Sequence, residues 1–329
     1  MITLQKIKNI LSMKKIFLLL SFLLLLGFGV IYLLIPGEIK ISSVAIAGCT
    51  EKEFGKCISN NSRWLDWLPE SNKNKASVLS NKNFTYNNCT YHLITPLLHG
   101  LSFITEYENF SIKNTLEYGT YKQDSISVIW SGSFKASNNP VTRIKQYLQA
   151  VHFKKTTDTL LSRLTAFVLV PKNIYGFNIH KTSFENKFLI ATKLQLNHNP
   201  STNEIYQIID ELRVYNKEKN GIEIDHPMFH ASMLDSLHYN IMIAIAIDRE
   251  IEQNKKYFLV RMAHMDGSFV SADVNGGPTS IKKAHEEIEN FMTDHRFSPP
   301  GIPFEVLITD RRNVSDTSKW VTTIYHPST

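Results

Sequence analysis

A run of uncharged residues near the N-terminus, Ile16 to Ile35, constrains the chain more than any other feature. Leu, Phe and Ile dominate the run, and a helix of about twenty residues spans roughly 30 Å, the thickness of a bilayer's hydrocarbon core. A cleaved signal peptide usually has an apolar region of about 7–15 residues, followed by small residues at the cleavage site. This run is longer and ends at Pro36-Gly37 instead. The sequence therefore predicts a single retained transmembrane anchor within residues 1–37.

The lysines before the anchor predict its orientation. Lys14 and Lys15 directly precede the apolar run, and Lys6 and Lys8 lie further upstream. Lys and Arg are enriched on the cytoplasmic side of membrane helices. We therefore expect the N-terminus in the cytoplasm and the bulk of the chain outside it, with a cytoplasmic body as the alternative.

The charge balance of the body argues against a nucleic-acid-binding protein. The chain has 36 Lys and Arg residues against 30 Asp and Glu residues, a formal net charge of +6. Residues 1–37 hold four of the lysines and no acidic residue, so the rest of the chain carries 32 basic and 30 acidic side chains. Proteins that bind phosphate backbones need a basic surface. We therefore expect no nucleic-acid partner.

After the anchor, residues 38–170 have the pattern of one domain. Glu38–Ala47 alternates as a strand does, and Thr50 to Glu53 forms a capping box that predicts a short helix. Trp64 and Trp67 follow as expected packing residues, and short β-type stretches fill much of residues 75–137. From Pro140 the period changes to that of one long amphipathic helix, whose apolar stripe is predicted to face the sheet. The stripe consists of Ile144, Tyr147, Leu148, Val151, Leu160, Leu161, Leu164 and Phe167.

Residues 171–329 contain an approximate internal repeat with a period of about 76 residues. Each copy predicts a βαββ-like half, and two such halves packed side by side enclose a cleft at their pseudo-twofold axis. The expected elements of the first copy are a strand over 188–196, a helix over 203–217 and a strand over 241–247. Those of the second copy are strands over 257–264 and 269–274, a helix over 280–293 and a strand over 320–325.

The cysteines and histidines do not form a recognisable metal or disulfide pattern. Three cysteines are too few for a disulfide framework and lack metal-ligand spacing; they are Cys49, Cys57 and Cys89. Three histidines could suggest metal ligands, but their segment contains Pro227 and has the pattern of a loop and a strand; they are His226, His230 and His238. His264 and Asp266 form a weak acid/base candidate at a strand end. We therefore expect no metal and no cofactor.

Two sets of motifs resemble known families. Ile35–Ile41, Thr50–Phe54 and Arg63–Trp67 resemble the opening of SRPBCC (START-like, helix-grip) proteins, of which many bacterial members carry an N-terminal membrane helix. Phe297–Asp310, with the run Pro-Pro-Gly-Ile-Pro-Phe-Glu, and Thr322–Pro327 resemble the close of GyrI-like domains, the effector-binding modules of AraC- and MerR-type regulators. Together these resemblances cover nearly the whole chain.

The resemblance implies an α+β chain with three parts. An N-terminal transmembrane helix is followed by a helix-grip antiparallel sheet with a long C-terminal helix, and then by a pseudo-twofold duplicated βαββ GyrI-like domain. Helix-grip domains leave an apolar cavity under the long helix. GyrI-like domains bind lipophilic, often cationic compounds between their halves with a buried Glu as counter-ion, and some relatives are hydrolases.

On this resemblance Glu305 is the counter-ion candidate, because it occupies the matching Pro-Phe-Glu position. Aromatic residues in strands beside it are expected to form the wall of the pocket, where their faces attract a cation by about 0.5–2 kcal/mol; they are Tyr257, Phe258, Phe304, Trp320 and Tyr325. The family commonly has a second acid in the last strand. Here Thr323 stands at that position, which favours binding over catalysis.

The sequence thus leaves three functional hypotheses open. The first is a membrane-tethered protein that binds a small lipophilic molecule, with cations among the candidates, as a sensor or sequestering module. The second is a hydrolase of lipophilic or electrophilic compounds with Glu305 as general base. The third is a non-catalytic envelope scaffold in which both pockets have collapsed.

Overall fold

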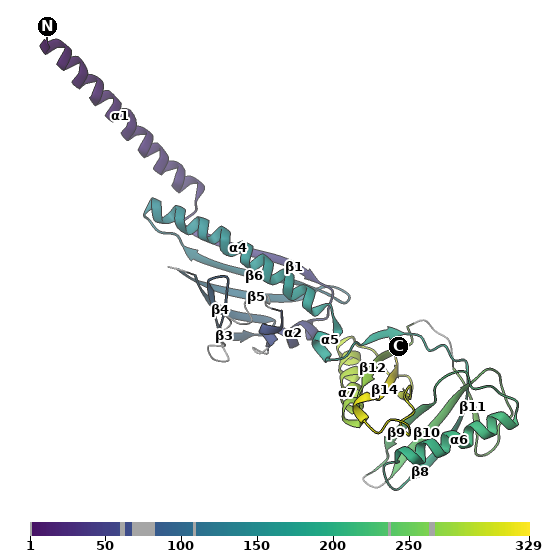
Figure 1. Cartoon of the computed structure of the whole chain (residues 1–329). Coiled ribbons are helices and arrows are strands. Elements are labelled where there is room, and N and C mark those ends of the chain that lie inside the picture. The colour runs from purple at the N-terminus through teal and green to yellow at the C-terminus, as the bar shows by residue number, and fades with distance from the viewer. Residues whose placement is uncertain (1, 60–62, 68–82, 108–109, 236–237, 263–266) are drawn as a thin grey trace. The chain divides into compact units, whose positions relative to one another are not determined.

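The computed structural model describes residues 2–59, 63–67, 83–107, 110–235, 238–262 and 267–329. The chain divides into two compact units, unit 1 (Met1–Leu169) and unit 2 (Val170–Thr329) (Figure 1). Each unit contains helices and one antiparallel sheet, so the predicted α+β fold class is confirmed. The candidate pair His264 and Asp266 lies outside the described residues.

Helix α1 (Ile2–Leu34) contains the apolar run. Its segment Ile16–Leu34 has a mean hydropathy of 2.7, and none of it is buried. By length and composition this segment can cross a membrane, and a signal sequence near an N-terminus has the same features.

Unit 1 is a six-stranded antiparallel sheet with a long helix along it, as Figure 1 shows. The strands lie in the order β1-β6-β5-β4-β3-β2, so that the first strand pairs with the last one. They are β1 (Glu38–Ala47), β2 (Asn83–Tyr86), β3 (Cys89–Leu97), β4 (Gly100–Tyr107), β5 (Phe110–Lys122) and β6 (Ser125–Lys135). The helices are α2 (Glu51–Ser59), α3 (Trp64–Trp67) and α4 (Pro140–Val168). The predicted capping box begins α2, because Thr50 and Glu53 each accept the other's backbone N–H, at 2.8 and 3.2 Å.

Aromatic rings fill the interior of unit 1. Trp64 lies 4.9 Å from Phe84 between ring centroids, and Phe84 stacks on Tyr91 at 4.3 Å. Trp130 packs edge-on against Phe103 at 5.1 Å. Trp64 and its neighbour Trp67 are both buried, and the Trp64 Nε1–H donates to the carbonyl of Ile58. Both tryptophans thus take part in packing, as the sequence predicts.

The apolar stripe predicted for the long helix is only half buried. Leu160, Leu161 and Leu164 do face the sheet. In the N-terminal half, however, Ala150 and Phe153 occupy the buried face, and four residues of the stripe are exposed instead: Ile144, Tyr147, Leu148 and Val151. The prediction was wrong for these four because a three-and-four spacing identifies an apolar face but not which of two apolar faces meets the sheet.

Unit 2 is an eight-stranded sheet built from two similar halves. The strand order β11-β8-β10-β9-β13-β14-β12-β7 presents the same arrangement counted from either edge. The strands are β7 (His180–Thr182), β8 (Phe188–Leu196), β9 (Met228–Met233), β10 (Tyr239–Ile247), β11 (Phe258–Arg261), β12 (Phe269–Asn275), β13 (Phe304–Val306) and β14 (Val321–Pro327). The helices are α5 (Pro171–Tyr175), α6 (Thr202–Glu218), α7 (Pro278–Asp294) and the 3-10 turn η3 (Thr317–Lys319).

The second copy of the repeat begins differently from the prediction. Strand β12 takes the place equivalent to β8, since it pairs with β14 as β8 pairs with β10. Strand β11, which lies in the segment predicted as the leading strand of that copy, pairs instead with β8 at the far edge of the sheet. Strand β7 likewise pairs with β12 of the other half. The edge strands are thus exchanged between the halves, which a repeat in the sequence does not reveal.

The two halves of unit 2 meet where β9 pairs with β13. The register places Glu305 opposite Phe229 and Val306 opposite Met228. Helix α6 packs on β8 and β10, and α7 packs on β12 and β14. Helix α6 begins with a complete capping box of Ser201 and Glu204, as the sequence predicts.

Candidate functional site

A cavity of about 650 Å³ lies between α6 and α7 beside the β9–β13 pair, and we call it the α6–α7 cleft. Both helices begin at its rim, because Thr202 and Pro278 are among the lining residues. Other lining residues include Ile205, Phe229, His230, Ile281, Lys282, His285, Glu289, Phe304, Glu305, Arg311 and Trp320. The cleft therefore draws on both halves of the repeat, where the pseudo-twofold predicts it.

Glu305 lies in this cleft and is held in an ion pair. Its Oε2 lies 3.1 Å from a terminal guanidinium nitrogen of Arg311, and its Oε1 lies 3.7 Å from Nε2 of His285. The Glu305 side chain is 15% exposed and that of Arg311 only 8%. A charge so far removed from water needs a partner, and Arg311 supplies it within the chain.

Arg311 also occupies the aromatic face that a cation would use. Its guanidinium carbon lies 4.9 Å from the ring centroid of Trp320, and the nitrogen that contacts Glu305 also donates to Thr322 Oγ1 at 3.0 Å. Among the described residues, the buried Nε of Arg311 has no hydrogen-bond acceptor. The cleft is therefore lined by a carboxylate that is neutralised within the chain, and the paired guanidinium keeps one N–H without an acceptor below the surface.

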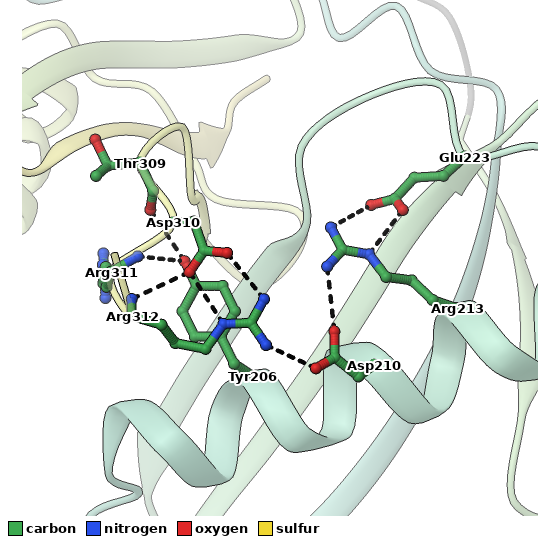
Figure 2. A network of polar contacts seen from close by, with 8 residues as sticks. All are labelled: Tyr206, Asp210, Arg213, Glu223, Thr309, Asp310, Arg311 and Arg312. Carbon is green, nitrogen blue, oxygen red and sulfur yellow. Dashed lines mark hydrogen bonds and ion pairs between the residues drawn. The ribbon is translucent and has the colours of Figure 1, made fainter. Parts of the chain in front are cut away.

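A polar network fixes the loop that carries Arg311 (Figure 2). The Tyr206 hydroxyl on α6 accepts the backbone N–H of Arg311 and donates to the carbonyl of Thr309, both at 3.0 Å. Burial raises the pKa of this phenol. Because Tyr206 belongs to the first half of the repeat and the loop to the second, the bonds position Arg311 across the pseudo-twofold.

Arg312 adds a second clamp between the same two segments. Its guanidinium bridges Asp310, at 2.8 Å, and Asp210 of α6, at 2.7 Å, and stacks 4.6 Å from the Tyr206 ring centroid (Figure 2). The hydrogen bond from Arg312 lowers the pKa of Asp310. Asp210 in turn contacts Arg213, which pairs with both carboxylate oxygens of Glu223. This network lies outside the cleft and holds the backbone of Arg311 against α6.

Histidines connect the cleft to the buried last strand. Nδ1 of His285, on α7, lies 2.8 Å from Nε2 of His326, on β14. Burial, together with the nearby His285, lowers the pKa of His326 to about 4, so the ring is neutral at pH 7. His230 lies on β9, where burial also lowers its pKa and Nδ1 meets the carbonyl of Pro303 at 2.7 Å.

The structure separates the three histidines that were considered as metal ligands. His230 lines the cleft, whereas His226 and His238 are exposed, and His238 lies 2.9 Å from Asp235. Within the described part of the chain, no three His, Cys, Asp or Glu residues are grouped as metal ligands would be. The three cysteines are buried and free, and burial raises the pKa of each thiol.

Of the six residues predicted for the pocket, three line the cleft: Glu305, Trp320 and Phe304, although the ring of Phe304 packs on the other face of the sheet. Tyr257 packs on Tyr215 of α6, 4.6 Å between centroids, in a separate groove. Phe258 is on β11, four strands from β13. Tyr325 stacks on Phe304 at 5.2 Å in the cluster of the opposite sheet face. Strand order and the alternation of side chains across a sheet, neither of which the motif specifies, separate these three from Glu305.

Three residues of the site were not predicted from the sequence: Arg311, His285 and His326. Ile281, Lys282, His285 and Glu289 recur at helical spacing, and that pattern could have shown that one face of α7 contributes to a polar site. Arg311 gave no such signal, because its pairing with Glu305 depends on how residues 307–312 turn back. Thr323, which the resemblance aligned with a second acid, donates to Asp273 at 2.7 Å.

Searches with family models and among curated proteins give no match to the chain. Three solved structures are similar to it in fold at low identity. The C-terminal domain of EcmrR aligns over 46% of this chain and 98% of its own length, with a TM-score of 0.40 and 11% identity. A hydrolase from Listeria innocua aligns over 46% of this chain and 90% of its own length, with a TM-score of 0.34 and 10% identity. The di-domain ARO/CYC protein BexL aligns over 88% of this chain and 84% of its own length, with a TM-score of 0.32 and 6% identity.

Proposed function

We propose that this chain is a membrane-tethered protein that binds a small lipophilic molecule in the α6–α7 cleft. The observation that carries the proposal is the cleft itself, whose volume of about 650 Å³ lies within the range of ligand pockets, roughly 300–1,000 Å³. Apolar and aromatic side chains line it together with a similar number of polar and charged ones. On this proposal unit 1 is a helix-grip domain, unit 2 a GyrI-like domain, and Ile16–Leu34 a retained single-pass anchor.

The charges in the cleft favour an uncharged or anionic ligand over a cation. Arg311 already neutralises Glu305 and covers the face of Trp320, so the two features that attract a cation are occupied. The positive ends of α6 and α7 lie at the rim, and the two further charged side chains that line the cleft, Lys282 and Glu289, offset each other. A lipophilic molecule with a carbonyl or carboxylate end matches this arrangement, since a small shift of the Arg311 side chain would bring its buried Nε–H, which has no acceptor in the structure, to that end.

The same ion pair weakens the hydrolase hypothesis. A general base must take up a proton in the reaction, and Glu305 would lose its ion pair with Arg311 by doing so. Binding without turnover requires no such loss. The scaffold hypothesis is disfavoured for unit 2 because the cleft is open in the structure.

Three adamantane probes that differ only in their polar end test this function. We expect adamantane carboxylate and carboxamide to raise the unfolding temperature of the full-length protein in detergent more than adamantane methylamine does. A ligand at a hundredfold excess over its Kd stabilises the native state by about 2.7 kcal/mol. In Glu305→Gln the carboxylate should bind about tenfold more tightly, a gain of about 1.4 kcal/mol, because Arg311 is no longer neutralised.

The matched control is Glu250→Gln, which removes another Arg-paired carboxylate, bonded to Arg261 of β11, outside both the cleft and the network of Figure 2. It should leave all three probe affinities unchanged. Tightest binding of the amine to the wild type, lost in Glu305→Gln, would restore the cation site and contradict our ligand class. Absence of a shift with all three probes would remove the support for a lipophile-binding cleft.

A further inference from the structure

The solvent side of α4 carries an apolar stripe that the fold of unit 1 does not use. Val141, Ile144, Leu148 and Val151 are 73%, 37%, 63% and 42% exposed. They follow one another at intervals of three and four residues, so they lie on one face of the helix. Tyr147, 41% exposed, borders them. The face that packs on the sheet is a different one, formed in the same half of the helix by Ala150 and Phe153.

This stripe begins beside the end of the apolar helix α1. The Tyr32 hydroxyl donates to the carbonyl of Asn138, just before α4. The Arg143 guanidinium donates to the carbonyl of Ile35 at 3.0 and 2.5 Å and lies 4.7 Å from the Tyr32 ring centroid. Arg143 is buried by these contacts. If α1 crosses a bilayer, the first turns of α4 therefore lie at its headgroups, where Tyr is a common interfacial residue.

The charges around the stripe match an anionic lipid surface. From Lys135 to Thr157 the chain contains five Lys and Arg residues and no Asp or Glu, and the next acid is Asp158. Lys145 and Lys155 are exposed next to the stripe, and Lys154 pairs with Asp158. An exposed apolar face flanked by lysines is the pattern of helices that lie in the membrane interface.

We propose that the N-terminal half of α4 lies in the headgroup region of an anionic bilayer, with the stripe from Val141 to Val151 against the acyl chains. This inference rests on the proposed anchor but is independent of any ligand in unit 2. On this inference unit 1 contacts the membrane surface directly through α4. The stripe is about 15 Å long at the rise of an α-helix.

The test uses the full chain reconstituted in phosphatidylcholine vesicles with and without phosphatidylglycerol. Leu148→Cys carries an environment-sensitive fluorophore, and the matched control Ser162→Cys carries it two heptads further along the same exposed face. The native cysteines are buried, so labelling is selective. We expect blue-shifted emission and roughly twofold or greater quenching by headgroup-linked nitroxide lipid at position 148, enhanced by phosphatidylglycerol, and little of either at 162.

Each other outcome has a distinct meaning. A chain that fails to float with the vesicles contradicts the anchor, and with it both this inference and the tether of the proposed function. A floating chain with equally aqueous labels at both positions contradicts the inference alone. A blue shift at 148 without quenching by the lipid nitroxide would show that a protein surface, such as a second copy of the chain, covers the stripe, and would overturn the proposal.

Discussion

Replacement of Arg311 by Gln is expected to lower the free energy of unfolding of unit 2 by about 3 kcal/mol and to reverse the charge preference of the α6–α7 cleft. Removing one partner of a buried ion pair costs about 3–5 kcal/mol because the other charge remains without compensation. The lower end applies here, since Glu305 keeps 15% of its side chain exposed. Hydrogen exchange of peptides from β13 and β14 in the full chain measures the loss.

The same variant tests the ligand class. With the guanidinium gone, Glu305 and the face of Trp320 become available to a cation, so adamantane methylamine should bind Arg311→Gln more tightly than adamantane carboxylate does. Arg261→Gln is the control, because it breaks a two-bond pair with Glu250 that lies outside both the cleft and the network of Figure 2. If Arg311→Gln leaves both the exchange protection and the order of probe affinities unchanged, Arg311 does not have the role described here.

The second large effect is a loss of stability in mild acid that depends on His326. Burial holds its pKa at about 4 in the folded chain, against 6.5 for an ordinary histidine. Below pH 6.5 the unfolded chain therefore takes up a proton that the folded chain does not, so stability falls as the pH drops towards 4 and this contribution then levels off. The shift corresponds to roughly 3 kcal/mol in total.

His326→Gln isolates this contribution from that of the carboxylates. Exchange protection of unit 2, corrected for the pH dependence of the intrinsic rate, should fall more steeply between pH 6.5 and 4 in the wild type than in this variant. His226→Gln, which replaces an exposed ring, should follow the wild type. Parallel curves for wild type and His326→Gln would mean that the buried ring is not kept neutral by the fold.

Local signals in the sequence predicted much of the fold, and the failures occurred where tertiary pairing decides. The capping boxes at Thr50 and Ser201 formed because they need only residues three apart. The exchange of β7 and β11 between the halves of unit 2 depends on contacts distant in sequence. Four residues of the stripe predicted for α4, from Ile144 to Val151, were wrongly assigned to the sheet, because periodicity does not reveal which of two apolar faces meets it.

The site was predicted only in part, again because local motifs can be read from the sequence and contacts between distant residues cannot. The Pro-Phe-Glu motif correctly placed Glu305 in a strand at the junction of the two halves, because the order of the strands determines that position. That its charge is neutralised by Arg311 depends on a loop fixed by Tyr206 and Arg312, whose partners lie about one hundred residues away. The family resemblance left a cation among the candidate ligands, whereas the pairing of Glu305 with Arg311 supports the acceptor that we propose.

Tryptophan fluorescence of the full chain tests the central claim most directly. Trp320 lines the α6–α7 cleft, whereas the other three tryptophans are buried in the interior of unit 1. Titration with adamantane carboxylate, which does not fluoresce, should produce a saturable change in emission that is absent in Trp320→Phe. A titration without change, or an equal change in both proteins, would contradict binding in the cleft.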